Sequence, residues 1–162
     1  MKKVSQKKVT TIRNKPSRKQ AEEAVKILIK WAGDNPEREG LQETPKRVVN
    51  SYKEFFSGYD SKPEQILSKT FDEVEGYDEM VIVRDIAIES HCEHHMVPFI
   101  GIAHIGYIPN KRIVGISKLA RIADVFAKRL QTQEIMTAQI ADTINEVLKP
   151  KGVAVVIDAQ HQ

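Results

Sequence analysis

Residues 80–108 read MVIVRDIAIESHCEHHMVPFIGIAHIGYI, and this stretch decides the fold. Apolar residues alternate with others over 80–88, interrupted at Arg84, and a second apolar run extends over 99–108. Both runs are typical of β-strands, because successive side chains of a strand point to opposite faces of its sheet. The polar segment 89–98 separates them. The pattern predicts two neighbouring strands joined by a polar loop.

Helical patterns flank the two predicted strands, because apolar positions recur there every three or four residues. Helices are predicted at 17–32, 44–56, 117–130 and 135–148, with a short helix at 63–67 and a final strand at 153–157. Ser17, Thr44 and Ser117 are the expected N-caps. The order of elements indicates the α+β class, with a largely antiparallel sheet that carries helices on one face. Exposed edges of such a small sheet favour an oligomer.

Length and composition set the class of protein. A chain of 162 residues, 41% hydrophobic and 29% charged, fits one globular domain. No apolar run approaches the roughly 18–20 residues that a membrane helix needs, and the N-terminus lacks the apolar segment of a secretory signal. A single cysteine excludes an intrachain disulfide and suits a reducing compartment. We therefore expect a cytoplasmic protein with no membrane partner.

The charges are distributed unevenly along the chain. Residues 1–20 hold eight Lys and Arg and no acid, whereas the rest of the chain carries a net charge of −5. A basic tail of this kind can contact RNA or an acidic surface, but a solvated arm is the commoner case. Because the chain after residue 20 has a net negative charge, no nucleic acid partner is expected. We predict a disordered tail at 1–19 and one domain at 20–162.

The densest group of reactive side chains is the run ESHCEHH at 89–95, with three of the five histidines and the single cysteine. Cys92 and His95 have the two-residue spacing that is common among zinc ligands. A lone cysteine is more often a small buried hydrophobe. Together, in a polar segment between two strands, the pair favours zinc. A zinc site needs three or four ligands, however, and this pair supplies two.

Several separate motifs resemble the GTP cyclohydrolase I family. They are TPKRV at 44–48, CEHHMVPF at 92–99, GYIPN at 106–110, GISKLAR at 115–121 and RLQTQE at 129–134. These motifs occur in the family's order and with its spacing, and the resemblance covers roughly residues 20–162. Their agreement makes chance a poor explanation.

The resemblance implies a tunnelling fold (T-fold), in which sheets from several subunits join into a barrel with helices outside. It implies a homodecamer with active sites between subunits. The implied reaction is the zinc-dependent opening of the imidazole ring of GTP, which releases formate and gives 7,8-dihydroneopterin triphosphate, the first step of pterin and tetrahydrofolate biosynthesis.

Roles for individual residues follow from the resemblance. Cys92 and His95 would bind Zn²⁺, which acidifies the water that attacks C8 of the purine. His94 and His161 would be acid/base groups, because imidazole exchanges protons near neutral pH.

The resemblance also implies the residues that bind GTP. Gln133 and Glu134 would recognise the edge of the guanine, with the carboxylate of Glu134 accepting from its N–H groups. The triphosphate would be bound by Arg47, Ser117, Lys118 and Arg121, because basic groups and a helix N-terminus attract anions.

The chain departs from the family at its C-terminus. The family's third zinc ligand is a cysteine two residues after the position of His161, and the sequence ends at Gln162. Neither His91 nor His161 matches a ligand of the family. We therefore expect a truncated form that binds zinc weakly and turns GTP over slowly. The alternatives are a GTP-binding, oligomer-forming homologue with impaired catalysis, and another T-fold enzyme of purines or pterins.

Overall fold

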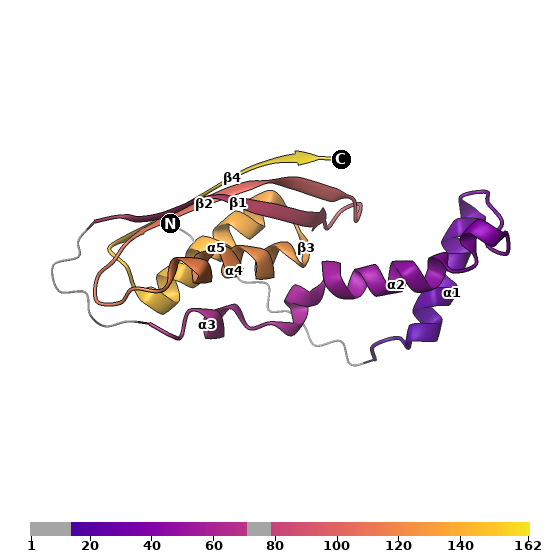
Figure 1. Ribbon diagram of the computed structural model, residues 1–162, viewed down its shortest axis with the longest axis horizontal. Helices are drawn as coiled ribbons and strands as arrows, with labels where there is room; N and C mark the ends of the chain where they lie inside the picture. Colours follow the sequence, from indigo (N-terminus) through magenta and orange to yellow (C-terminus); the bar gives the residue numbers. More distant parts are fainter. Residues whose placement is uncertain (1–13, 71–78) are drawn as a thin grey trace. The chain divides into compact units, whose positions relative to one another are not determined.

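The computed structural model describes residues 14–70 and 79–162 (Figure 1). These residues fall into two compact units, one within 14–55 and the other within 56–162. The predicted tail lies mostly outside the described residues. Among the described helices, none is long and apolar enough to cross a membrane.

The smaller unit consists of α1 (Arg18–Trp31), the 3₁₀ turn η1 (Glu39–Leu41) and α2 (Thr44–Phe55). Ser17 caps α1 as predicted: its hydroxyl accepts from the backbone N–H of Gln20, while the side chain of Gln20 accepts from the N–H of Ser17. Gly33, with φ of 96°, follows the helix. Both predicted helices of this unit are confirmed.

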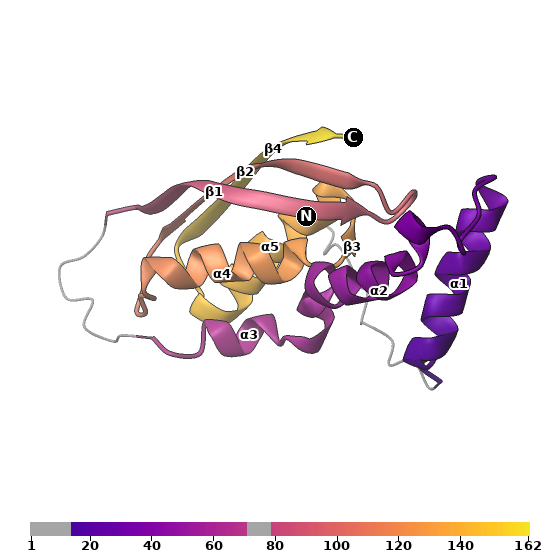
Figure 2. The same ribbon diagram turned by 45° about the vertical axis from the view of Figure 1, so that its right-hand side comes forward.

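The larger unit is a curled four-stranded sheet with two helices on one face (Figure 2). The strands, in the spatial order β3-β1-β2-β4, are β1 (Val81–Cys92), β2 (Pro98–Ile108), β3 (Leu130–Gln131) and β4 (Gly152–His161). The helices are α4 (Ile116–Ala127) and α5 (Gln133–Leu148), and α3 (Pro63–Ile66) and the 3₁₀ turn η2 (Ser57–Asp60) pack beside α4. β1, β2 and β4 pair antiparallel, whereas β3 pairs parallel to β1. The α+β class is confirmed, and the arrangement is consistent with the T-fold.

The core lies between the sheet and these two helices. Phe99, Ile105 and Tyr107 of β2 are buried, and so are Leu119 of α4 and Ile140 of α5. Burying each such side chain contributes about 1.5–3 kcal/mol to folding. The apolar stripes that predicted α4 and α5 are therefore the stripes that face the sheet.

A β-bulge in β1 changes which face its side chains occupy. The register with β2 shifts between Val83 and Ile86, and Asp85 has a φ of 57°. The backbone N–H of Asp85 donates to Nδ1 of His104 at 3.2 Å. Ile82 is consequently 54% exposed, whereas Ile86 is 9% exposed. The single alternation predicted over 80–88 is wrong across the bulge, because the extra residue inverts the pattern.

Several predicted boundaries were also wrong. β1 continues through 89–92, which was predicted as loop, and β4 continues to His161. Ser117 is not the cap of α4, which begins at Ile116 after Gly115. The helix ends at Ala127. The strands extend into these polar residues because their backbone groups pair with β2, whatever side chains they carry.

Candidate active site

One end of the sheet gathers most of the predicted site residues. Cys92 is the last residue of β1, and the turn at 93–97 leads into β2. His161, the last residue of β4, pairs with Phe99 near the beginning of β2, so β4 ends where β2 begins (Figure 1). On the other side Cys92 pairs with Gln131 of β3, which leads directly into α5. The residues brought to this end are Cys92, His94, His95, Gln133, Glu134 and His161.

Backbone hydrogen bonds fix the turn that carries the histidines. The N–H of Cys92 donates to the carbonyl of Val97 at 2.9 Å, and the N–H of Met96 donates to the carbonyl of Cys92 at 2.8 Å. Met96 has a φ of 59°, which lets the chain reverse within these few residues. The N–H of Glu93 donates to the carbonyl of Gln131 at 2.8 Å. The turn is therefore anchored on both of its sides.

The cysteine thiol is buried, with 8% of Cys92 exposed, whereas His94 and His95 are exposed. Sγ of Cys92 lies 3.7 Å from Nδ1 of His94, and the rings of His94 and His95 lie 6.2 Å apart. Within residues 14–70 and 79–162, no group of three or more His, Cys, Asp or Glu side chains could hold a metal. Thiol and imidazole are the ligands that zinc prefers, so the chemistry of the pair fits zinc. Cys92 and His95 remain a prediction of two zinc ligands.

Two further histidines lie against aromatic rings. The ring of His161 stacks on Phe99 with centroids 4.9 Å apart and 17° between the planes, while the residue itself remains exposed. His91 makes an edge contact with Phe56 at 5.4 Å, and burial lowers the pKa of its imidazole. Stacking positions His161 at the end of the sheet.

The predicted guanine-binding residues begin α5. Thr132 caps this helix by accepting from the N–H of Ile135 at 3.2 Å. The side-chain amide of Gln133 donates to the carbonyl of Ile157 in β4 at 2.9 Å, and Glu134 is exposed in the first turn. One donor of Gln133 is thus already used within the fold, and the carboxylate of Glu134 remains accessible.

Gln131 was not predicted as a site residue, although it lies within the RLQTQE motif. It is 3% exposed, and its amide donates to the carbonyl of Phe126 and to Oε1 of Gln139, both at 3.0 Å. These bonds tie β3 to α4 and to α5. The motif contains two glutamines, Gln131 and Gln133, and the sequence does not indicate which amide is buried.

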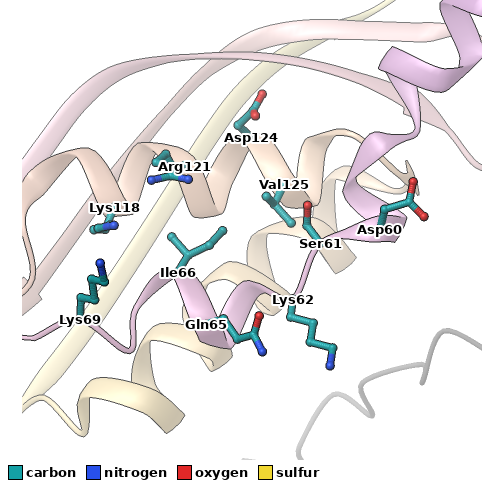
Figure 3. Close-up of a pocket in the computed structure, with 10 residues that line it drawn as sticks. All are labelled: Asp60, Ser61, Lys62, Gln65, Ile66, Lys69, Lys118, Arg121, Asp124 and Val125. Atoms are coloured by element: carbon teal, nitrogen blue, oxygen red, sulfur yellow. The ribbon is translucent and has the colours of Figure 1, made fainter.

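Two of the four predicted triphosphate-binding residues line one cavity in the larger unit. Lys118 and Arg121 line a cavity of about 690 Å³ beside α4, together with Lys62 and Lys69 (Figure 3). Ser117 is exposed in the first turn of α4 and is not part of the lining. Arg47 is exposed on α2 in the smaller unit. Neither Lys62 nor Lys69 was predicted, because about 50 residues separate them from Lys118 and no local motif marks them.

Arg129 anchors the segment that forms one wall of this cavity. Its Nε donates to the carbonyl of Gly58 at 3.0 Å, and its Nη2 donates to the carbonyl of Ser61 at 3.3 Å. The guanidinium also lies over the rings of Tyr59 and Phe126, at 5.9 and 5.0 Å from their centroids. Partial burial of the guanidinium lowers the pKa of Arg129.

Replacing Arg129 by methionine is expected to destabilise the larger unit by about 2–3 kcal/mol, because the apolar stem is retained while two charge-assisted hydrogen bonds are lost. Urea unfolding followed by circular dichroism measures the change. The control is Arg112→Met, an exposed arginine whose loss should change the free energy of unfolding by less than about 0.5 kcal/mol. Equal stability of the two variants would contradict the anchoring role.

Comparisons with known proteins identify a family and close relatives. The model of the family described as GTP cyclohydrolase I matches residues 21–162. A protein of Maricaulis maris named GTP cyclohydrolase 1 is 60% identical over 151 residues, which cover 93% of this chain and 74% of that protein. Proteins with the same name from Brucella suis and Brucella abortus are 60% identical over 158 residues, covering 98% of this chain and 74% of each.

Proposed function

The chain belongs to the GTP cyclohydrolase I family, and on this premise we propose that it hydrolyses the imidazole ring of GTP. The products are formate and 7,8-dihydroneopterin triphosphate. The observation that best supports the proposal is that β1, β3, β4 and the start of α5 meet at one end of the sheet. The elements that carry the proposed thiol, imidazoles, amide and carboxylate are therefore neighbours in the fold although they are separated in sequence.

In this proposal the histidines exchange protons with the substrate. Ring opening adds one water at C8 and breaks one of the two C8–N bonds, and a second water breaks the other bond and releases formate. In each hydrolysis one proton must be removed from the water and one supplied to the departing nitrogen. His94, which lies against the thiol, and His161, which Phe99 holds by stacking, are the groups for these transfers. Both are exposed and can therefore reach a bound nucleotide.

Cys92 and His95 would hold zinc, because a thiolate and an imidazole match its preferences. When bound, zinc supplies Lewis acidity, which makes water a better nucleophile near neutral pH. The pair provides two of the ligands that such a site needs.

Glu134 would orient the guanine by accepting hydrogen bonds from its N–H groups, and Gln133 would lie beside it. Adenine presents a different set of donors and acceptors on this edge, so the carboxylate favours guanine. The triphosphate would lie against Lys118 and Arg121, with Ser117 and Arg47 as further contacts.

We further propose that the protein is a cytoplasmic homo-oligomer, a homodecamer as in the family, and serves folate synthesis. Large apolar side chains on the face of the sheet opposite the helices support an oligomer: Ile82, Ile100, Ile102 and Val156 are 54%, 49%, 38% and 59% exposed. Sheets that join edge to edge into a barrel would turn such a face inward.

The test of the function is incubation of the purified protein with zinc and GTP. We expect formate and a fluorescent pterin, measured after oxidation, to form in equal amounts, and ATP to give neither. Glu134→Gln is expected to lower kcat/KM for GTP by about thirtyfold, because the carboxylate makes charge-assisted bonds to the base.

The matched control is Glu23→Gln, which changes an exposed carboxylate on α1 and should leave kcat/KM unchanged. The proposal fails if the protein, supplied with zinc, binds GTP but releases no formate.

A further inference from the structure

Four of the ten residues that line the cavity beside α4 are cations. Its walls carry Lys62 and Lys69 on one side and Lys118 and Arg121 on the other, against the two acids Asp60 and Asp124. Asp124 is engaged elsewhere, because its Oδ1 lies 3.6 Å from Nζ of Lys128. Figure 3 shows the carboxylates of both acids directed away from the three cations Lys69, Lys118 and Arg121. The cavity therefore has a positive end.

At the positive end of the cavity, Lys69 lies on the wall that faces α4. In Figure 3 its ammonium group points toward Lys118, and the guanidinium of Arg121 lies on the same side. Within residues 14–70 and 79–162, no ion pair involves any of these three side chains. Three cations that have no ion-pair partner among the described residues repel one another, and an anion placed among them relieves the repulsion.

The position of Lys69 is set by the core. Leu67 is 0% exposed, and Ile66 lines the cavity between the two basic walls. Earlier in the same segment, the carbonyls of Gly58 and Ser61 accept from Arg129. The segment that leads to Lys69 is thus held at its start by Arg129 and near its end by the burial of Leu67.

We propose that Lys69 is a further residue of the triphosphate site, which binds the phosphate chain from the wall opposite Lys118 and Arg121. The inference rests on the proposed function, since GTP is the ligand that brings a triphosphate to this cavity. A triphosphate carries about four negative charges at neutral pH, and cations on two walls can contact more than one of its phosphates. Lys69 thereby favours GTP over guanosine nucleotides with fewer phosphates.

The test is titration calorimetry of the whole protein with inorganic tripolyphosphate, which needs no turnover. Lys69→Met is expected to weaken binding of tripolyphosphate about tenfold, because one charge-assisted contact is lost. Lys69→Arg should restore affinity to within about threefold, since it keeps the charge. The control Lys151→Met removes an exposed lysine before β4 and should bind as the unsubstituted protein does.

A second arm adds GTP and GDP as competitors. We expect GTP to displace tripolyphosphate, and the preference for GTP over GDP to shrink about tenfold in Lys69→Met. The inference is overturned if Lys69→Met binds tripolyphosphate as tightly as the control, or if GTP does not displace it. If tripolyphosphate binding depends on Lys69 but the protein releases no formate from GTP, the anion site is supported and the proposed reaction is overturned.

Discussion

Replacing Cys92 by alanine is expected to remove bound zinc and to lower GTP turnover by about a thousandfold or more. The loss of a Lewis acid costs several kcal/mol of transition-state stabilisation, and about 4 kcal/mol corresponds to a factor of a thousand. Zinc per chain is measured with a chromogenic chelator after denaturation, and turnover is measured as formate released. Both values are compared with those of the unsubstituted protein.

A competing explanation assigns Cys92 only to the core, because it is 8% exposed and packs within the apolar cluster. The two explanations separate in a pair of variants. If the thiol binds metal, Cys92→Ala and Cys92→Ser both lose zinc. If it is only a core residue, both keep zinc, and Cys92→Ser, which buries a hydroxyl, unfolds at a lower temperature than Cys92→Ala.

Val97→Ala is the matched control for the turn. Val97 is 37% exposed, and its carbonyl, which accepts from Cys92, is unaffected by the side chain. This variant should therefore retain zinc. Retention of zinc by both cysteine variants would show that the thiol is not a ligand.

The fold was predictable where its signals are local. Apolar residues recurring about every 3.6 residues predicted α4 and α5. Ser17 and Gly33 predicted the two ends of α1. The bulge at Asp85 was not predictable, because it depends on a contact with His104 in the neighbouring strand. The two-residue strand β3 is also invisible in sequence, since only its pairing with β1 defines it.

The candidate site divides in the same way. Cys92, His94 and His95 are adjacent in sequence, so their density was visible at once. The approach of His161 to this turn depends on the register of β4 against β2. The wall formed by Lys69 depends on packing across about 50 residues, which no single-sequence pattern records.

Replacing Gly101 by alanine is expected to destabilise the larger unit by about 3 kcal/mol and to displace the end of β4. A Cβ at this position would lie 2.0 Å from the carbonyl oxygen of Asp158 and 2.6 Å from Cα of Ala159. Both are backbone atoms, so relief requires the strand itself to move, and overpacking of this kind costs up to about 3 kcal/mol. Urea unfolding measures the loss of stability.

The same substitution tests whether β4 positions His161. Gly101 pairs with Ala159, two residues before His161, whose ring stacks on Phe99. Displacement of β4 should weaken that stack, and the ring-proton resonances of His161 should then move toward the values of an unstacked imidazole. The value of kcat should fall about tenfold, the magnitude typical of a mispositioned acid/base group.

Gly152→Ala is the control, because a Cβ at Gly152, the first residue of β4, meets no atom within 4 Å. It should change stability by less than about 0.5 kcal/mol and leave the resonances of His161 in place. If Gly101→Ala loses stability while His161 keeps both its resonances and its kcat, then β4 serves the core alone. The proton transfers would then have to be assigned to His94 alone and not to His161.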